Sequence, residues 1–199
     1  DKTTDFYGAA TTTSDSHTRA FLKIQDGCNY VCSFCIIPFA RGRSKAISVN
    51  GALENAKELI ANGFKEIVLT GVNIGEYETS SGEKLTDMVR ALLDLEGLER
   101  LRLSSVEPNT ITDELLEVFK SSPKFKDHFH IPLQSGDDEI LKNMRRKYTV
   151  ADYKKVINKI ITAFPNAGIG ADLICGFPGE PKEQFENTYN LVKELPITH

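Results

Sequence analysis

The 199-residue sequence has no tryptophan and only four cysteines. It also lacks any apolar run approaching the ~20 residues that a membrane-spanning helix needs. Its N-terminus has neither the basic nor the apolar stretch of a signal peptide, so we expect a cytoplasmic protein without membrane association. Hydrophobic residues make up 40% and charged residues 26%, which excludes disordered, collagen-like and disulfide-scaffold proteins. The formal net charge of -4 gives no general electrostatic reason to expect a polyanionic partner.

Strand-like and helix-like segments alternate from residue 19 onward. Strands are predicted at residues 20–25, 66–73, 100–106, 128–133 and 169–177. Helices are predicted at residues 51–61, 85–95, 112–120, 150–163 and 180–195, with Thr112 as an N-cap. This alternation implies an α/β fold with parallel strands and right-handed crossovers. Periodicity alone does not distinguish an open doubly wound sheet from a full or partial (β/α) barrel.

The two ends of the chain predict its domain organisation. Residues 1–18 are rich in Thr, Ser and Asp without hydrophobic periodicity, and we interpret them as a linker or tail from a missing N-terminal domain. The sequence ends at residue 199, where a sixth strand is expected to begin. We therefore expect residues 19–199 to form one core domain that is incomplete at its C-terminus. The sequence does not define the oligomeric state, for which a monomer is the expectation.

Three of the four cysteines follow the first predicted strand. Cys28, Cys32 and Cys35 form a C-x3-C-x2-C arrangement, and thiolates this close together can bind one metal centre. Disulfides fit poorly, because three clustered cysteines leave one unpaired and no secretion signal is present. A structural zinc site normally takes four nitrogen or sulfur ligands, so it would need Cys175 or a distant histidine as the fourth.

An iron–sulfur cluster explains the number of cysteines better than zinc does. Cuboidal clusters usually take four cysteines, so three would leave one iron open to a substrate or cofactor. Phe34, directly before Cys35, is placed either to cover a planar ligand beside that iron or to pack in the core. Cys175 lies in the fifth predicted strand and is most simply a small buried hydrophobic residue.

The cysteine spacing, with Phe34 before the third cysteine, resembles the C-x3-C-x-Φ-C signature of radical S-adenosylmethionine (SAM) enzymes, where Φ is aromatic. Further segments resemble the methylthiotransferase subfamily, and among its members the enzymes that modify N6-threonylcarbamoyladenosine in tRNA. These segments are FLKIQDGCNYVCSFCIIPFARGRS, EIVLTGVNIGEY, LRLSSVEP, HFHIPLQSGDDEILKNMRRKYT and DLICGFPGEPKEQFENTY. The resemblance implies a partial (β/α)6 radical SAM barrel, similar to a TIM barrel and truncated at about the sixth strand.

The resemblance also implies the chemistry. Cys28, Cys32 and Cys35 would hold a [4Fe–4S] cluster, and SAM would bind its fourth iron. After reduction by an external one-electron donor, a 5′-deoxyadenosyl radical would abstract a hydrogen atom from carbon 2 of the adenosine, where sulfur and a methyl group are added. No Ser/His/Asp or paired-carboxylate arrangement is apparent, and the abstraction requires none. We therefore expect no catalytic residue beyond the cluster ligands.

Residues at the ends of the second and third predicted strands are candidates for SAM binding. Gly71 and Asn73 lie where the resemblance implies a turn that meets the amino group of SAM; a tight strand-to-loop turn is the alternative. Ser105 and Glu107 lie at the end of the third strand, which is the end that hosts ligands in α/β folds. There a carboxylate is suited to ribose hydroxyls, although a solvated loop carboxylate is the more common role for a single Glu.

Four further candidates follow later in the sequence. Gln134 ends the fourth strand and is suited to orient a polar ligand, while Arg146 belongs to a basic cluster suited to a phosphate or the SAM carboxylate. Asp172 lies in an apolar strand, where a carboxylate is costly unless it is paired or functional. Asp172 and Ile174 precede a turn that resembles the adenine-contacting turn of the family. Asp172 replaces the first glycine of that family's G-x-I-x-G-x-x-E pattern.

The resemblance places this chain within a larger enzyme whose full-length form acts on tRNA. Complete methylthiotransferases carry a second three-cysteine cluster and a small RNA-binding β-barrel domain. Only Cys175 remains once the three clustered cysteines are assigned, so these 199 residues cannot hold a second such cluster. Three alternatives stay open. One is a methylthiotransferase for isopentenyladenosine in tRNA or for a ribosomal protein aspartate, another is a radical SAM enzyme for a different substrate, and the third is a non-catalytic zinc-binding module.

Overall fold

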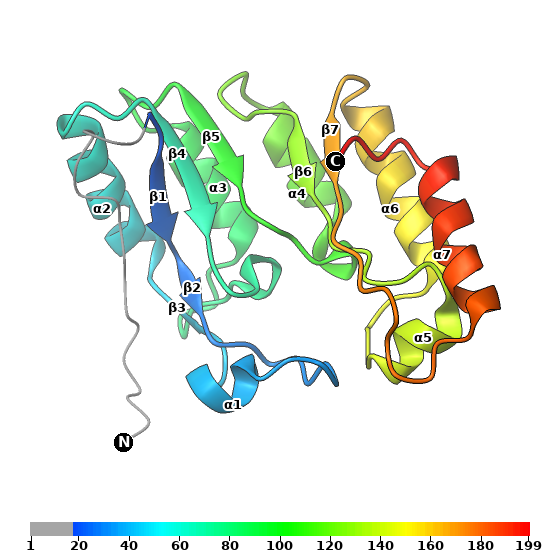
Figure 1. Ribbon diagram of the computed structural model, residues 1–199. Helices are drawn as coiled ribbons and strands as arrows, with labels where there is room; N and C mark the ends of the chain where they lie inside the picture. The colour runs from blue at the N-terminus through cyan, green and yellow to red at the C-terminus, as the bar shows by residue number, and fades with distance from the viewer. Residues whose placement is uncertain (1–17) are drawn as a thin grey trace.

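The computed structural model describes residues 18–199, which contain seven strands and seven α-helices (Figure 1). The strands are β1 (Ala20–Lys23), β2 (Gln25–Asp26), β3 (Lys45–Ala46), β4 (Glu66–Thr70), β5 (Arg100–Leu103), β6 (His128–His130) and β7 (Gly168–Gly170). The helices are α1 (Ile37–Arg41), α2 (Val49–Ala61), α3 (Leu85–Leu93), α4 (Asp113–Lys120), α5 (Asp138–Asn143), α6 (Val150–Ala163) and α7 (Lys182–Glu194). The strands and helices alternate except where β2 follows β1 and α6 follows α5. Two 3-10 turns, η1 (Ile74–Glu76) and η2 (Pro108–Thr110), follow β4 and β5.

The main strands run parallel, as the alternation predicts. β1, β4 and β5 form one parallel sheet in that order, and β6 and β7 form a second parallel pair. The backbone hydrogen bond from Val106 N to His130 O, 2.9 Å, joins the two groups beyond the ends of β5 and β6. Within residues 18–199 the strands do not close into a barrel. The fold is therefore a partial α/β barrel, which confirms the predicted fold class.

Alternating side chains give the strands one apolar and one polar face. Leu22, Leu69 and Leu101 are fully buried. In Figure 1, α3 and α4 lie behind the strands and α2 lies beside β1. On the opposite face, Glu66 accepts hydrogen bonds from Arg100 Nε at 2.8 Å and from Arg102 Nε at 2.7 Å. Successive residues of a strand point to opposite faces of the sheet. The apolar residues therefore share the face that packs against helices, and the charged residues share the other face.

The observed elements differ from the predicted ones mainly at the strand ends. Each main strand is shorter than predicted, because the backbone leaves the ladder where it enters the loops of the candidate site. The hairpin of β2 and β3, and the short helices α1 and α5, were not predicted. The N-cap at Thr112 is confirmed, since its side chain accepts from Leu115 N at 3.1 Å. The predicted linker lies outside the described residues, apart from residue 18.

The last residues of the chain lie beside β7. Thr198 N donates to Ile169 O at 2.8 Å, and Ala171 N donates to His199 O at 3.0 Å. These are the bonds that a neighbouring strand would make. No helix within residues 18–199 is long and apolar enough to cross a membrane.

Candidate functional site

The loop of residues 27–36, here called the cysteine loop, leaves the sheet through the β2–β3 hairpin. The fully buried Gln25 supports its start: Nε2 donates to Gly27 O at 2.7 Å, and Oε1 accepts from Asn73 N at 2.8 Å. Gly27 has φ 70°, and a Cβ there would lie 2.2 Å from the carbonyl oxygen of Arg43. Only glycine therefore fits where the hairpin turns into the loop.

Asp26 fixes the same hairpin by charge. Its carboxylate contacts Lys23 Nζ at 2.7 Å and Arg41 Nη1 at 3.2 Å. Burial alone would raise the pKa of Asp26, but hydrogen bonds from Lys23 and from the backbone N–H of Gly27 bring that pKa below its usual value. The residue before the cysteine loop, Asp26, is therefore an ionised carboxylate that accepts several hydrogen bonds.

The cysteine loop presents three free thiols. Cys32 is buried, whereas Cys28 and Cys35 are half-buried. The Sγ of Cys28 accepts from Tyr30 N at 3.3 Å and from Asn73 Nδ2 at 3.8 Å, and the Sγ of Cys32 accepts from Arg146 Nη1 at 3.2 Å. Burial raises the pKa of the Cys28 thiol, and the two N–H donors only partly oppose this. Two of the three sulfurs therefore already have N–H donors of the kind that stabilise negative sulfur.

The three thiols have no further metal-ligating side chain grouped with them among the described residues. Among residues 18–199, no group of three or more His, Cys, Asp or Glu side chains could hold a metal ion as arranged. Cys175 is exposed, His128 stacks on His199, and His130 bonds to Ser105. No fourth zinc ligand therefore joins the three thiols in this part of the chain. A cuboidal cluster takes each thiolate at a different iron, so its sulfurs need not converge on one point, and the three-thiol set fits it.

Arg146 brings three of the predicted residues together. Its side chain is only 3% exposed, and it pairs through Nη2 with Glu107 while Nη1 reaches Cys32. Its Nε donates to the hydroxyl of Tyr148 at 3.2 Å. Burial alone would lower the pKa of Arg146, but the hydrogen bond and charge of Glu107 raise it above its usual value. The guanidinium is thus a permanent positive charge beside a cysteine of the loop.

The turn after β4 adds a buried acceptor without a partner. Asn73 is 5% exposed, and its Oδ1 has no hydrogen-bond partner among the described residues. Such an orphaned oxygen is costly unless a ligand satisfies it. A Cβ on Gly71 would lie 2.4 Å from Cγ2 of Ile74, so glycine is needed for packing there. An amide oxygen beside Cys28 is chemically suited to accept from an ammonium group.

Three strand ends carry a row of neighbouring side chains that the sequence did not predict. Ser105 Oγ lies 2.7 Å from Nδ1 of His130, and Nε2 of His130 lies 3.4 Å from Oδ1 of Asp172. The expectation that no Ser/His/Asp arrangement exists was therefore wrong, because strand pairing joins residues that lie far apart in the sequence. The row links two of the predicted SAM contacts, Ser105 and Asp172, through His130.

The other predicted residues lie around the same strand ends. Gln134 has φ 66°, accepts from Ile174 N at 2.9 Å and donates through its own N to Asp172 O at 2.8 Å. Phe34 is 42% exposed, so it does not pack in the core. Cys175 is exposed, which corrects the prediction that it is a buried hydrophobic residue. Its strand, β7, ends at Gly170, and the backbone has left the ladder before Cys175.

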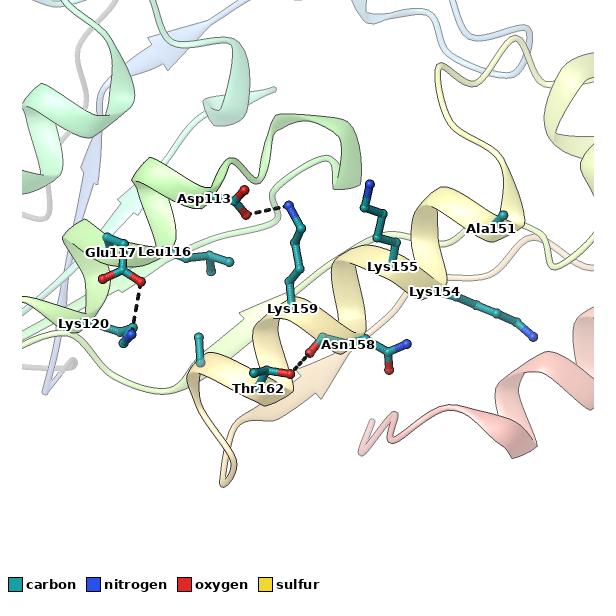
Figure 2. Close-up of a pocket in the computed structure, with 11 residues that line it drawn as sticks. Asp113, Leu116, Glu117, Lys120, Ala151, Lys154, Lys155, Asn158, Lys159 and Thr162 are labelled. Atoms are coloured by element: carbon teal, nitrogen blue, oxygen red, sulfur yellow. Dashed lines mark hydrogen bonds and ion pairs between the residues drawn. The ribbon is translucent and has the colours of Figure 1, made fainter.

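A large groove lies elsewhere, between α4 and α6, with a volume of about 800 Å³ (Figure 2). Four lysines line it, and three of them are paired: Lys159 with Asp113 at 2.5 Å, Lys120 with Glu117 at 3.1 Å, and Lys154 with Glu194 at 2.7 Å. None of the predicted site residues lines this groove. The candidate site is therefore the cysteine loop and the strand ends beside it.

Comparisons with known proteins identify the family of this chain. The family model described as "Radical SAM superfamily" matches residues 22–192. The threonylcarbamoyladenosine tRNA methylthiotransferase MtaB of Bacillus subtilis is 46% identical over 183 residues, covering 89% of this chain. The tRNA-2-methylthio-N(6)-dimethylallyladenosine synthase of Clostridium tetani is 40% identical over 182 residues, covering 90% of this chain. The chain spans 40% of the length of each of these relatives.

A solved structure shows the same fold at lower identity. The radical S-adenosylmethionine methyltransferase TsrM of Kitasatospora setae, with cobalamin and a [4Fe–4S] cluster bound, superimposes with a TM-score of 0.75. The match has 18% sequence identity and covers 89% of this chain and 35% of that one.

Proposed function

This chain belongs to the radical SAM superfamily, and on that premise we propose that it is the radical core of a transferase, a tRNA methylthiotransferase. We propose a [4Fe–4S] cluster and SAM as its cofactors and carbon 2 of N6-threonylcarbamoyladenosine as its target. The cysteine loop carries this proposal, because it combines three free thiols in the C-x3-C-x2-C spacing with N–H donors on two of their sulfurs.

The residues of the site divide into cluster ligands and SAM contacts. Cys28, Cys32 and Cys35 would hold the cluster. When bound, the cluster and SAM supply a 5′-deoxyadenosyl radical that removes a hydrogen atom from the substrate. Asn73 would accept from the SAM amino group with its orphaned Oδ1. Phe34, exposed beside Cys35, would cover the adenine or the substrate ring.

The remaining contacts would hold the other groups of SAM. Glu107 and Asp172 offer carboxylates to the ribose hydroxyls, and Ser105 and Gln134 supply neutral hydrogen-bonding groups. Ile174 would present its backbone or apolar side chain to the adenine. Arg146 contributes its positive charge to the SAM carboxylate and to Cys32, and its pairing with Glu107 sets its position. Gly71 keeps the turn before Asn73 close-packed.

The identity of the substrate is supported by the relatives. The relative named for threonylcarbamoyladenosine is 46% identical, and the relative named for dimethylallyladenosine is 40% identical. We therefore propose N6-threonylcarbamoyladenosine first, with isopentenyladenosine in tRNA as the second candidate. Within the longer proteins, we propose a preceding domain with a second cluster, a following RNA-binding domain, an external one-electron reductant and a cytoplasmic location.

Deuterium transfer tests this proposal. The anaerobically reconstituted chain, with full-length Bacillus subtilis MtaB in parallel, is incubated with SAM, a reductant and anticodon stem-loops deuterated at carbon 2 of the modified adenosine. We expect deuterium in 5′-deoxyadenosine only with the threonylcarbamoyl substrate. Deuterium transfer only from the isopentenyladenosine stem-loop would contradict the proposed substrate and support the second candidate. The absence of any 5′-deoxyadenosine would contradict the proposed cofactors.

A further inference from the structure

We propose that Tyr30 is a positioning residue that fixes the cysteine loop, with Asn109 and Lys147 as its two partners from outside the loop. The purpose of this device rests on the proposed function, because the loop it fixes would hold the cluster. The geometry itself does not depend on any cofactor.

Tyr30 is the inward-pointing residue of the loop between the first two cysteines. Its neighbours Asn29 and Val31 are exposed, whereas Tyr30 is only 3% exposed. Its hydroxyl accepts a hydrogen bond from Nδ2 of Asn109, in η2, at 2.7 Å. Its backbone N–H donates to the Sγ of Cys28 at 3.3 Å. A shift of Tyr30 would therefore also move its backbone N–H, which donates to the Sγ of Cys28.

Lys147 holds the face of the same ring. Its Nζ lies 3.7 Å from the ring centroid and 3.8 Å from Oε1 of Glu76 in η1. A cation over an aromatic ring is attracted by the quadrupole of that ring. Tyr30 is thus held at its edge by Asn109 and on its face by Lys147.

The segment that carries Lys147 also binds the rest of the loop. Ser33 N donates to Met144 O at 3.2 Å, and Ser33 Oγ donates to Asn143 O at 2.9 Å. Arg146 in the same segment contacts Cys32. The connection between α5 and α6 therefore holds the loop from residue 30 to residue 33. A phenylalanine would pack as well as Tyr30, but it would lack the hydroxyl that η2 holds.

Alkylation of the metal-free, reduced chain tests this role. Iodoacetamide labelling of Cys28 and Cys32 is followed by peptide mass spectrometry, with the exposed Cys175 as the internal reference. We expect Tyr30→Phe and Lys147→Met each to accelerate labelling of Cys28 and Cys32 about five-fold relative to Cys175, because each removes one contact that keeps the loop closed. Lys147→Arg, which keeps the cation, should restore the original rates.

Two features make the result decisive. In Lys147→Met, loss of the positive charge would by itself disfavour the thiolate form of nearby cysteines and slow their labelling. Faster labelling of Cys28 and Cys32 in this variant would therefore show that the loop has opened. Lys193→Met is the matched control, because it removes a similar contact, 5.2 Å from the ring of Tyr189 in α7, away from the loop. Unchanged labelling in both Tyr30→Phe and Lys147→Met would overturn the inference. Failure to assemble a cluster would contradict the proposed function but leave these rates unaffected.

Discussion

The strand–helix frame and the cysteine loop are stabilised by different interactions. In the frame, residues such as Leu22, Leu69 and Leu101 are fully buried, and hydrophobic burial dominates. In the cysteine loop, Phe34 and Ile36 are exposed, and the contacts to the rest of the chain are mainly hydrogen bonds and charges. The frame therefore determines where the loop emerges, and polar contacts determine how its sulfurs are presented. Mutations should separate these two roles.

The largest effect on stability is expected in the frame. Leu101→Ala removes a fully buried side chain of β5 and should lower the free energy of unfolding by about 3 kcal/mol, measured by urea denaturation. Val31→Ala, at a residue of the loop that is 54% exposed, should change stability by less than about 0.5 kcal/mol. Equal losses in the two variants would contradict the contrast between frame and loop.

A smaller effect is expected at the junction of frame and loop. Gly27→Ala places a methyl group against the backbone of Arg43 and should cost about 2 kcal/mol, with faster labelling of Cys28. Gly42→Ala is the control, because Gly42 also has positive φ (79°) but a Cβ there would have nothing within 4 Å. If both variants behave alike, backbone strain explains the loss and the close approach to Arg43 does not.

The smallest effect is expected on the polar face of the frame. Burial alone would raise the pKa of Glu66, but Arg102 and Arg100 bring it below the usual value. Its contribution to stability is therefore present above the unfolded pKa and is lost as pH falls through the folded pKa. Glu66→Gln should cost about 1 kcal/mol at pH 7 and almost nothing near pH 3, measured by urea denaturation at each pH. A cost independent of pH would show that packing, and not charge, accounts for the loss.

The sequence predicted the frame well because its signals are local. The alternation of apolar residues located all five main strands and the helices between them, and Thr112 was recognised as a cap from its neighbours alone. The short helices α1 and α5 escaped prediction because six residues or fewer carry little periodicity. The strand ends were predicted too long because ladder bonding, not composition, decides where a strand stops.

The site was predicted only in part because its contacts are not local. The three cysteines lie within eight residues, so their spacing was visible in the sequence. Arg146 and Cys32 are 114 residues apart, and only the fold brings them together. The row from Ser105 through His130 to Asp172 likewise depends on the pairing of neighbouring strand ends.

Electron paramagnetic resonance of the anaerobically reconstituted and reduced chain tests the central claim most directly. The wild type should bind about four irons per chain and give a cluster signal that changes when SAM is added. Cys32→Ala should lose the signal, while Cys175→Ala, at an exposed cysteine outside the loop, should keep it. A reducible cluster unaffected by Cys32→Ala, or one equivalent of zinc without labile sulfide, would contradict the account.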